Sequence, residues 1–426
     1  MRVLVAGLRE RLGPAAWNAL AGALPRLALL IAGIFVAQRF GAEAFARYSL
    51  AAITLALAGT LPGATLTTVA SKFVPEFAQG RAMRVGSGFR EIMGFATVIA
   101  VGLAVIVVAV APALSSSWAM QPPIDALLRV AGGAALVAVI AGALGGLLVG
   151  SGRFQASALA QLAGFAAFCA LLLPLARAWG IAGVIGALAA LYAGAAVVSA
   201  WSARAGFAVR RNPTAVAPWR PLASFFMATL IAAGFVTPVV WLCNAILAHR
   251  ESPLVALSQF NVAYQWYAVV SFAPAVLAQV EFVRMSQAKA RNDTSSLPVE
   301  LRRFVGRNAL VMLPLVALGI GCAPLLARLY HLESGAGERA IVVMFVAAFV
   351  ASLGNPAGLF LAVVDRIWLA SVLNVGWGII TLAAGWVMRD FGATGIAAAF
   401  LVGHLAHALV ATAIAYRLVA PRIHPT

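Results

Sequence analysis

Charged residues are scarce in this sequence. Only 10% of its 426 residues are Asp, Glu, Lys or Arg, whereas 63% are hydrophobic. An average globular protein has about 25% charged residues and about 45–50% apolar ones. A soluble domain could not bury so much apolar side chain, so the composition excludes a water-soluble protein. We therefore expect an integral membrane protein that crosses the bilayer many times.

Cysteines and acidic residues are also few. The three cysteines, Cys169, Cys243 and Cys322, lie in apolar stretches, and they have neither metal-ligand spacing nor a disulfide framework. We interpret them as small buried hydrophobic residues and expect no metal or other cofactor. The 13 acidic residues are outnumbered by 30 basic ones, which gives a net charge of +17. In a soluble protein that excess would suggest a nucleic-acid partner.

Long apolar runs, separated by short polar breaks, predict the membrane spans. Each run is close to the ~20 residues that a helix needs to cross a bilayer. The divisions at 150–155 and 364–367 are the weakest, because only a short turn with an arginine separates two runs. We predict twelve helices, at 17–38, 48–70, 92–113, 128–150, 155–177, 180–202, 221–247, 255–282, 308–330, 340–364, 367–388 and 391–416.

The basic residues between the spans predict the orientation in the membrane. With a cytoplasmic N-terminus, the inside segments hold 21 Lys and Arg and the outside loops hold 8, with Arg26 completing the 30. Cytoplasmic segments normally carry the excess. We therefore expect both termini in the cytoplasm. This distribution explains the net charge without any nucleic acid.

The chain repeats itself at an offset of 212 residues. Residues 177–183 match residues 389–395 in their glycine spacing, and Pro62 corresponds to Pro274. Six spans return the chain to its starting side, so the repeats are parallel. We predict a basic cytoplasmic lead-in at 1–16, a six-helix lobe at 17–202, a basic cytoplasmic linker at 203–220, a second six-helix lobe at 221–417 and a cytoplasmic tail at 418–426. Prolines inside the spans fit alternating access, in which two lobes rock about a central site.

Four segments resemble a known family. Residues 39–50, RFGAEAFARYSL, resemble the start of the second helix in polysaccharide exporters, and residues 71–76, SKFVPE, resemble its end. Residues 146–154, GLLVGSGRF, resemble their turn between helices 4 and 5, and residues 260–266, FNVAYQW, resemble their helix 8. The family is the lipid-linked oligosaccharide flippases of the multidrug/oligosaccharidyl-lipid/polysaccharide exporter superfamily.

That resemblance implies an all-α, V-shaped fold of two lobes in a bacterial inner membrane, and a transporter rather than an enzyme. It implies translocation of a polyprenyl-pyrophosphate-linked oligosaccharide from the cytoplasmic to the periplasmic leaflet. The pathway would be the biosynthesis of exopolysaccharide or of the O-antigen of lipopolysaccharide. The implied partners are this lipid-linked oligosaccharide, the lipid bilayer and other polysaccharide assembly proteins.

Two alternatives stay open. A multidrug exporter or another amphiphile exporter of the same superfamily is one. Cation-coupled multidrug exporters usually carry a carboxylate in the membrane interior of the first lobe, and the first six predicted helices here have no central Asp or Glu. A membrane-bound polymerase or acyltransferase is the other. A polymerase typically needs a large external loop, and the longest outside loop, 114–127, has Asp125 as its single acidic residue.

Arg26 is the leading candidate for substrate binding. It follows Pro25 and lies nine residues after Trp17, hence roughly 13 Å into a hydrocarbon core of about 30 Å. A charge there costs ~2.5–3.5 kcal/mol, and a guanidinium group suits phosphate oxygens. We predict that Arg26 binds the pyrophosphate. The alternative is a structural arginine bonded to helix carbonyls, and the counterpart in the second half is Thr237, beside Pro238.

Polar residues on the predicted helix 255–282 form a second candidate surface. Ser258, Asn261 and Gln265 share one helical face, and Tyr264 and Trp266 lie beside it. Amides bind hydroxyl groups and aromatic rings stack on sugars, so we predict that these residues line a substrate cavity. Hydrogen bonding between helices is the alternative. Three further asparagines are weaker candidates for the same lining: Asn18, Asn244 and Asn374.

His404 and His407 lie three residues apart, near the middle of the last span. They are candidates for proton coupling, and packed polar groups are the alternative interpretation. Glu281 and Asp365 lie at predicted cytoplasmic ends of helices. For these two acidic residues we expect solvated faces or turns.

Overall fold

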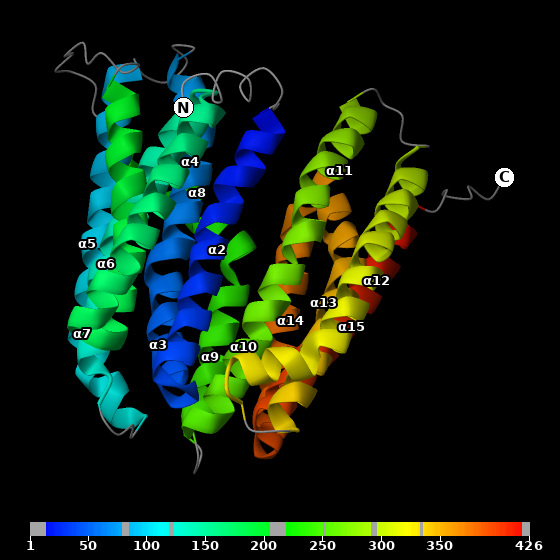
Figure 1. Cartoon of the computed structure of the whole chain (residues 1–426). Helices are drawn as coiled ribbons and strands as arrows, with labels where there is room; N and C mark the ends of the chain where they lie inside the picture. The colour runs from blue at the N-terminus through cyan, green and yellow to red at the C-terminus, as the bar shows by residue number, and fades with distance from the viewer. Residues whose placement is uncertain are drawn as a thin grey trace, which may run out of the picture. The chain divides into compact units, whose positions relative to one another are not determined.

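The computed structural model describes residues 14–78, 85–118, 123–204, 219–249, 253–290, 296–332 and 335–419. Within these ranges the chain is helical and has no strand (Figure 1). Most of the predicted lead-in and linker, and most of the tail, lie outside the described residues. Two compact units are present: unit 1 is Met1–Arg39 with Arg47–Trp241, and unit 2 is Phe40–Ala46 with Leu242–Thr426. The predicted lobes and linker stay a prediction.

Unit 1 contains α2 except its last residue, most of α3, the helices from α4 to α8, and the first part of α9. A single turn of π-helix, η1, separates α3 from α4, where a prediction from apolar runs alone gives one continuous helix. The elements are α2 (Pro14–Phe40), α3 (Ala42–Leu55), η1 (Ala56–Thr60), α4 (Leu61–Ala78), α5 (Val85–Ser117), α6 (Asp125–Gly150), α7 (Phe154–Arg204), α8 (Trp219–Gly234) and α9 (Val236–Ala248).

The long helix α7 is a helical hairpin. Its backbone leaves the helical conformation at Gly180, where φ is 57° and ψ is −133°. A Cβ atom on Gly164 would lie 2.2 Å from the carbonyl oxygen of Leu191, and one on Gly183 would lie 1.9 Å from that of Leu175. The two arms of α7 therefore pack antiparallel. This reversal agrees with the predicted boundary between 155–177 and 180–202.

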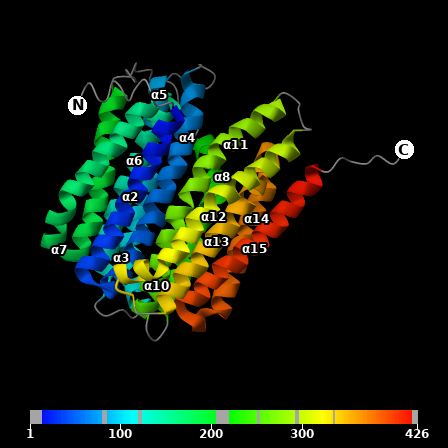
Figure 2. The same ribbon diagram turned by 45° about the vertical axis from the view of Figure 1, so that its right-hand side comes forward.

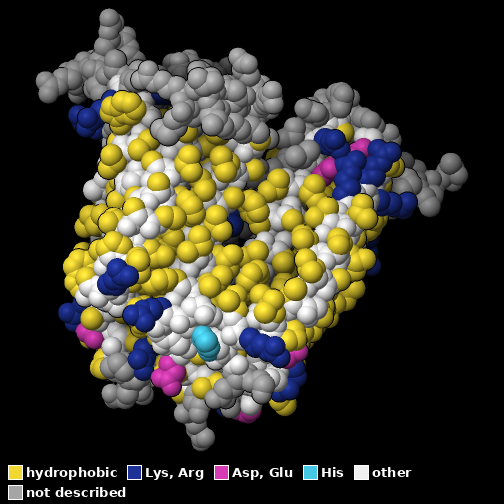
Figure 3. Space-filling model, in the orientation of Figure 1, with side chains coloured by type: hydrophobic (Ala, Val, Ile, Leu, Met, Phe, Trp, Pro, Cys, Tyr) yellow, Lys and Arg dark blue, Asp and Glu magenta, His cyan; other side chains and the backbone are white. Residues whose placement is uncertain are grey.

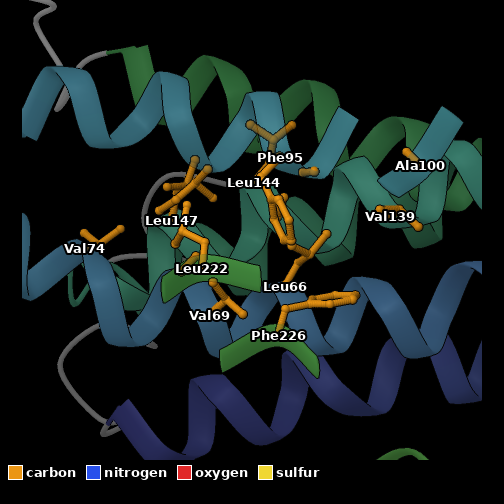
Figure 4. Close-up of a cluster of buried hydrophobic side chains, with 14 residues drawn as sticks. Leu66, Val69, Val74, Phe95, Ala100, Val139, Leu144, Leu147, Leu222 and Phe226 are labelled. Carbon is orange, nitrogen blue, oxygen red and sulfur yellow. The ribbon is translucent and has the colours of Figure 1, made fainter. Parts of the chain in front are cut away.

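The core of unit 1 lies between α4, α5, α6 and α8. Figure 4 shows its buried side chains, with Leu66 and Val69 on α4, Phe95 on α5, and Leu222 and Phe226 on α8. Glycines bring α4 and α6 close together, since a Cβ atom on Gly142 of α6 would lie 2.3 Å from the carbonyl oxygen of Gly63. Small residues allow this approach between membrane helices.

Unit 2 is built around α13. This helix packs against α15, α12 and α10, and Figure 2 shows α12 to α15 side by side. The helices that lie wholly in this unit are α10 (Pro253–Val270), α11 (Phe272–Ala290), α12 (Leu297–Leu329), α13 (Ala336–Val363), α14 (Ile367–Val387) and α15 (Gly392–Val419). The predicted weak division at 364–367 is a turn here, with Asp365 at a φ of 61°.

The repeated sequence forms the same turn in both units. Gly392 has a φ of 60° and a ψ of −137°, close to the values at Gly180. Three residues further on, a Cβ atom on Gly395 would lie 2.0 Å from the carbonyl oxygen of Met388, as one on Gly183 would lie against Leu175. Glycine is needed at both places in each turn, once for the positive φ and once for the close approach.

The surface of the helices suits a bilayer. On the face shown in Figure 3, hydrophobic side chains cover the middle of the helices, and charged ones gather near the ends. Among the described residues, nine helices are long and apolar enough to cross a membrane, or ten if the bent pair formed by α8 and α9 is one span. The sequence predicted twelve. All twelve predicted segments lie on helices, but α7 counts once here, and α10 and α11 are not among the counted spans.

Candidate functional site

Unit 2 contains a group of buried and half-buried rings, which we call the aromatic–histidine cluster. Its members come from three helices: Phe260, Tyr264 and Tyr267 from α10, Trp377 from α14, and Phe400 and His404 from α15. Tyr267 and His404 stack with ring centroids 5.8 Å apart, and the Tyr267 hydroxyl lies 3.0 Å from His404 Nε2. The cluster therefore links α10 to α15 by both packing and a hydrogen bond.

A glycine brings α14 against this cluster. At Gly403 of α15, an added Cβ atom would lie 2.1 Å from Thr381 Oγ1 and 3.2 Å from Trp377 Nε1. Both of these polar atoms are buried, and neither has a hydrogen-bond partner within the described parts of the chain. The cluster therefore lies beside two further polar atoms: the indole Nε1 of Trp377, which can donate a hydrogen bond, and the Thr381 hydroxyl, which can donate or accept one.

An asparagine pair lies near the start of α10. Asn261 Nδ2 donates to Asn244 Oδ1 at 2.6 Å and to the carbonyl oxygen of Leu257 at 2.8 Å. Asn244 is fully buried and Asn261 nearly so. Ser258 is buried as well, and its hydroxyl donates to the carbonyl of Val255. These contacts join α9 to α10, and the predicted cavity-lining role of the three residues stays a prediction.

The other predicted lining residues are half-buried and spread over several helices. Gln265 and Trp266 follow Tyr264 on α10, and only Tyr264 belongs to the aromatic–histidine cluster. Thr237 is at the start of α9, Asn374 is on α14 and Asn18 is on α2. His407 is half-buried one turn after His404. The structure thus brings Tyr264 and His404 into one cluster and places Asn18 and Thr237 in the other unit.

Arg26 lies in unit 1, in the middle of α2, and its side chain is exposed. Its Nη1 donates to the carbonyl oxygen of Gly22, one turn earlier, at 2.8 Å. The absence of a side chain on Gly22 leaves room for this contact, because an added Cβ atom would lie 3.4 Å from Nη1. Pro25 precedes it inside the helix. The guanidinium group is therefore partly oriented by its own helix and still reaches the surface of α2.

Sequence reasoning did not identify Phe260, Trp377 or Phe400 of the cluster as site residues, nor the neighbouring Thr381. A signal was available, since Trp377 and Thr381 lie at i and i+4, as do Phe400 and His404. Residues at this spacing share a helix face. A tryptophan or histidine in the middle of an apolar span, with a ring or hydroxyl one turn away, therefore indicates a packed polar cluster.

Three comparisons with known proteins extend this description. No protein-family model matches the chain. The structure resembles an inward-facing multidrug resistance MATE family transporter of the MOP superfamily, with a TM-score of 0.79 and 15% identity over 95% of this chain and 98% of that one. A MOP superfamily transporter from Pyrococcus furiosus gives a TM-score of 0.65 at 16% identity, covering 95% of this chain and 94% of the other.

Curated sequence relatives point in the same direction. The EPS I polysaccharide export inner membrane protein EpsE of Ralstonia solanacearum is 25% identical over 202 residues, which is 44% of this chain and 45% of EpsE. EpsE of Ralstonia nicotianae is 25% identical over 170 residues, or 38% of each chain. The chain matches less than half the length of these relatives. The chain has the fold of the MOP superfamily transporters and shares partial sequence similarity with polysaccharide export proteins of the inner membrane. The predicted multi-pass, inner-membrane localisation is therefore confirmed. The resemblance to a polysaccharide exporter is confirmed as well.

Proposed function

We propose that this protein is a flippase that moves a polyprenyl-pyrophosphate-linked oligosaccharide from the cytoplasmic to the periplasmic leaflet by alternating access. The MOP superfamily fold and the similarity to polysaccharide export proteins support a transporter of this kind. The product would enter O-antigen or exopolysaccharide assembly. A transporter of lipid-linked sugar needs a polar path for the sugar and a binding group for the pyrophosphate.

The proposed topology has twelve crossings and both termini in the cytoplasm. Counting α7 as two arms adds one span to the ten obtained with α8 and α9 joined. Helices α10 and α11 meet at Ser271 and together form one further span. An even number of crossings returns the chain to its starting side. The excess of basic residues in the segments on that side supports its assignment as the cytoplasmic side.

The position of Arg26 in the middle of α2 is the observation that supports the proposed cargo. Apart from Asn18 near its start and Gln38 and Arg39 at its end, the rest of α2 is apolar, and Arg26 places a permanent positive charge at mid-span. The pyrophosphate is the part of a lipid-linked sugar with the highest cost of crossing hydrocarbon, because its charge loses hydration there. A guanidinium group can offset that cost with paired hydrogen bonds to phosphate oxygens. We therefore assign pyrophosphate binding to Arg26.

The test uses a strain that lacks the gene and accumulates the lipid-linked repeat unit in the inner leaflet. We expect wild-type protein to clear this intermediate, Arg26→Ala to leave it, and Arg26→Lys to clear part of it. The control is membrane insertion, measured by the amount of each variant in the membrane fraction. Full clearance by the alanine variant contradicts the role of Arg26. Clearance of a fluorescent dye but not of the lipid-linked sugar favours a multidrug exporter, and truncated or modified glycans outside the cell favour an enzyme.

A second proposal concerns energy coupling at the aromatic–histidine cluster. His404 Nε2 accepts from or donates to the Tyr267 hydroxyl according to its protonation state. Among the described residues, Tyr267 of α10 stacks on His404, Tyr264 stacks on Tyr267, and His407 lies one turn later on α15. On α14, Trp377 packs against His404, and Thr381 lies near Gly403. Binding of a proton would therefore change the link between α10 and α15. Export by His404→Gln and His407→Gln that keeps the wild-type dependence on pH contradicts this coupling.

A further inference from the structure

A group of ionised side chains, separate from the sites described above, lies where α11 packs against α12. Glu281 on α11 is 2% exposed, and its Oε1 accepts hydrogen bonds from Arg307 of α12 and from Arg284 of α11. Arg284 Nη1 lies 3.5 Å from this oxygen. The predicted solvated face or turn is wrong for Glu281, because α12 covers its side chain. It is correct for Asp365, which lies in an exposed turn.

The carboxylate is covered, whereas the two arginines are not. The Glu281 side chain is 3% exposed, and those of Arg284 and Arg307 are 52% and 42% exposed. Each guanidinium has five N–H donors, and the contact with Glu281 fixes one nitrogen of each. The group therefore has a net charge of +1, with positive ends directed outward and a negative end buried below them.

Neighbouring basic residues at this end have other partners. Lys289 forms a salt bridge with Asp365, and Arg303 forms one with Glu300. Arg302 lies over the ring of Tyr416, 5.9 Å from its centroid. Arg284 and Arg307 differ from these residues, since they share a single buried carboxylate. This geometry holds two positive groups close together, as recognition of a phosphate requires.

An apolar surface continues from the arginines along α12. Gly306, beside Arg307, has open space where a side chain would lie. Exposed leucines then follow at helical spacing, beginning with Leu310 and Leu313. Figure 3 shows basic side chains gathered above hydrophobic ones at the end of the helices where α12 begins. A charged end followed by an apolar stripe matches a lipid with an anionic headgroup.

We propose that Arg284 and Arg307, positioned by Glu281, bind the phosphate group of an anionic lipid whose hydrocarbon chain lies along α12. The shared chemistry is a phosphate ester on an apolar chain. Two sources fit it: the diphosphate of a polyprenyl carrier and the headgroup of an ordinary anionic phospholipid. The site is on unit 2 alone, and it does not depend on the cargo assigned to Arg26.

The test is native mass spectrometry of the full-length protein, purified in detergent and mixed with one lipid at a time. The probes are undecaprenyl diphosphate, phosphatidylglycerol and zwitterionic phosphatidylethanolamine. The variant is the triple change Glu281→Gln, Arg284→Gln and Arg307→Gln, which removes the arginines without leaving a buried, unpaired carboxylate. The matched control is Arg302→Gln, which makes the same net change of one charge on the exposed surface of α12.

We expect the triple variant to bind the anionic probe about tenfold more weakly than wild type, a loss of about 1.4 kcal/mol. Arg302→Gln should bind like wild type, and both variants should elute as single species by gel filtration. If wild-type protein retains undecaprenyl diphosphate selectively, the polyprenyl carrier is the source of the bound phosphate group. If it retains phosphatidylglycerol equally well, the source is an ordinary phospholipid of the bilayer. Unchanged binding by the triple variant overturns the proposal. So does an equal loss in Arg302→Gln, or equally tight binding of phosphatidylethanolamine by wild type.

Discussion

In unit 1, α4 and α6 pack backbone against backbone, whereas in unit 2, α10, α14 and α15 meet through aromatic rings and polar groups. The contrast is clear at one repeated position. Gly146 of α6 lies so close to α4 that a Cβ atom would be 2.6 Å from the Cα atom of Thr67. Its counterpart 212 residues later, Gly358, has open space around the same point. Both units therefore have a glycine at this position, but only the glycine of unit 1 lies in close contact with a neighbouring helix.

The difference separates two tasks. Close approach of small residues gives α4 and α6 many van der Waals contacts and little room for polar groups. The rings of unit 2 leave room for His404, Tyr267 and buried hydroxyl and indole groups. Polar groups inside a membrane are costly and usually have a function. We therefore expect larger residues at the contact glycines of α4 and α6 to destabilise unit 1. In unit 2 we expect the loss of polar groups to lower stability.

The largest expected effect is overpacking in unit 1. At Gly142 an added methyl group would lie 2.3–2.5 Å from backbone atoms of Gly63, which cannot rotate away. We expect Gly142→Ala to destabilise the protein by ~3 kcal/mol or more, at or above the upper end for overpacked cores. The measurement is the melting temperature of the detergent-purified protein by size-exclusion chromatography. Gly133→Ala on the same helix is the control, because Gly133 is exposed with open space around it. Equal melting temperatures for the two variants contradict close packing.

The helices and the repeated turn could be predicted from the sequence. Apolar runs set the positions of all twelve predicted segments, and the spacing of Gly180 and Gly183 marked a turn that recurs at Gly392 and Gly395. The conformational requirement of glycine is local, so it is visible in the sequence. Arg26 was identifiable for a similar reason, since a charge in an apolar run is conspicuous without any knowledge of its neighbours.

The packing partners could not be predicted in this way. In a soluble helix the apolar face is the buried one, but in a membrane helix the face towards lipid is apolar too. Hydropathy therefore did not show that Phe400 and Trp377 pack around His404, or that α12 covers Glu281. Both depend on contacts between helices far apart in the sequence. The π-helical turn at Ala56–Thr60 also has no signal in the apolar pattern.

The next largest expected effect is the loss of stability when alanine replaces the glycine with positive φ in either repeated turn. This loss should be similar in the two units. Gly180 and Gly392 share a positive φ with a ψ near −135°, a conformation that costs other residues ~1–3 kcal/mol. We expect Gly180→Ala and Gly392→Ala to lower the melting temperature by similar amounts. The matched control is Gly376→Ala on α14, where an added side chain has open space. A large effect at one turn alone would show that the two turns are not equivalent.

A smaller effect is expected at the asparagine pair of unit 2. Asn261→Leu leaves the buried Asn244 amide without the 2.6 Å hydrogen bond that it accepts. Hydrogen bonds between membrane helices contribute ~0.6 kcal/mol on average and at most ~1.7 kcal/mol, and we expect a value near the upper limit because Asn244 is fully buried. A double-mutant cycle with Asn244→Leu measures the coupling energy. A coupling indistinguishable from zero shows that the pair does not stabilise the link between α9 and α10.

The smallest effect compares one tyrosine hydroxyl in each unit, and the two contacts that these hydroxyls make involve one pair of positions related by the repeat. Tyr192 in unit 1 corresponds to His404 in unit 2. Tyr192 joins α7 to η1 through Thr60, and His404 joins α15 to α10 through Tyr267. Tyr192 Oη lies 3.4 Å from Thr60 Oγ1, a long contact, whereas Tyr267 Oη lies 3.0 Å from His404 Nε2.

Removing the hydroxyl should therefore matter more in unit 2. We expect Tyr267→Phe to cost ~0.6 kcal/mol and Tyr192→Phe to cost less, both measured as shifts in melting temperature. Phenylalanine keeps the ring stacking of the cluster, so each shift in melting temperature reports the contacts of the hydroxyl group, which at Tyr267 include Ser271 as well as His404. If Tyr192→Phe is the more damaging change, the polar link of unit 1 is the stronger one, and the assignment of polar function to unit 2 loses its support.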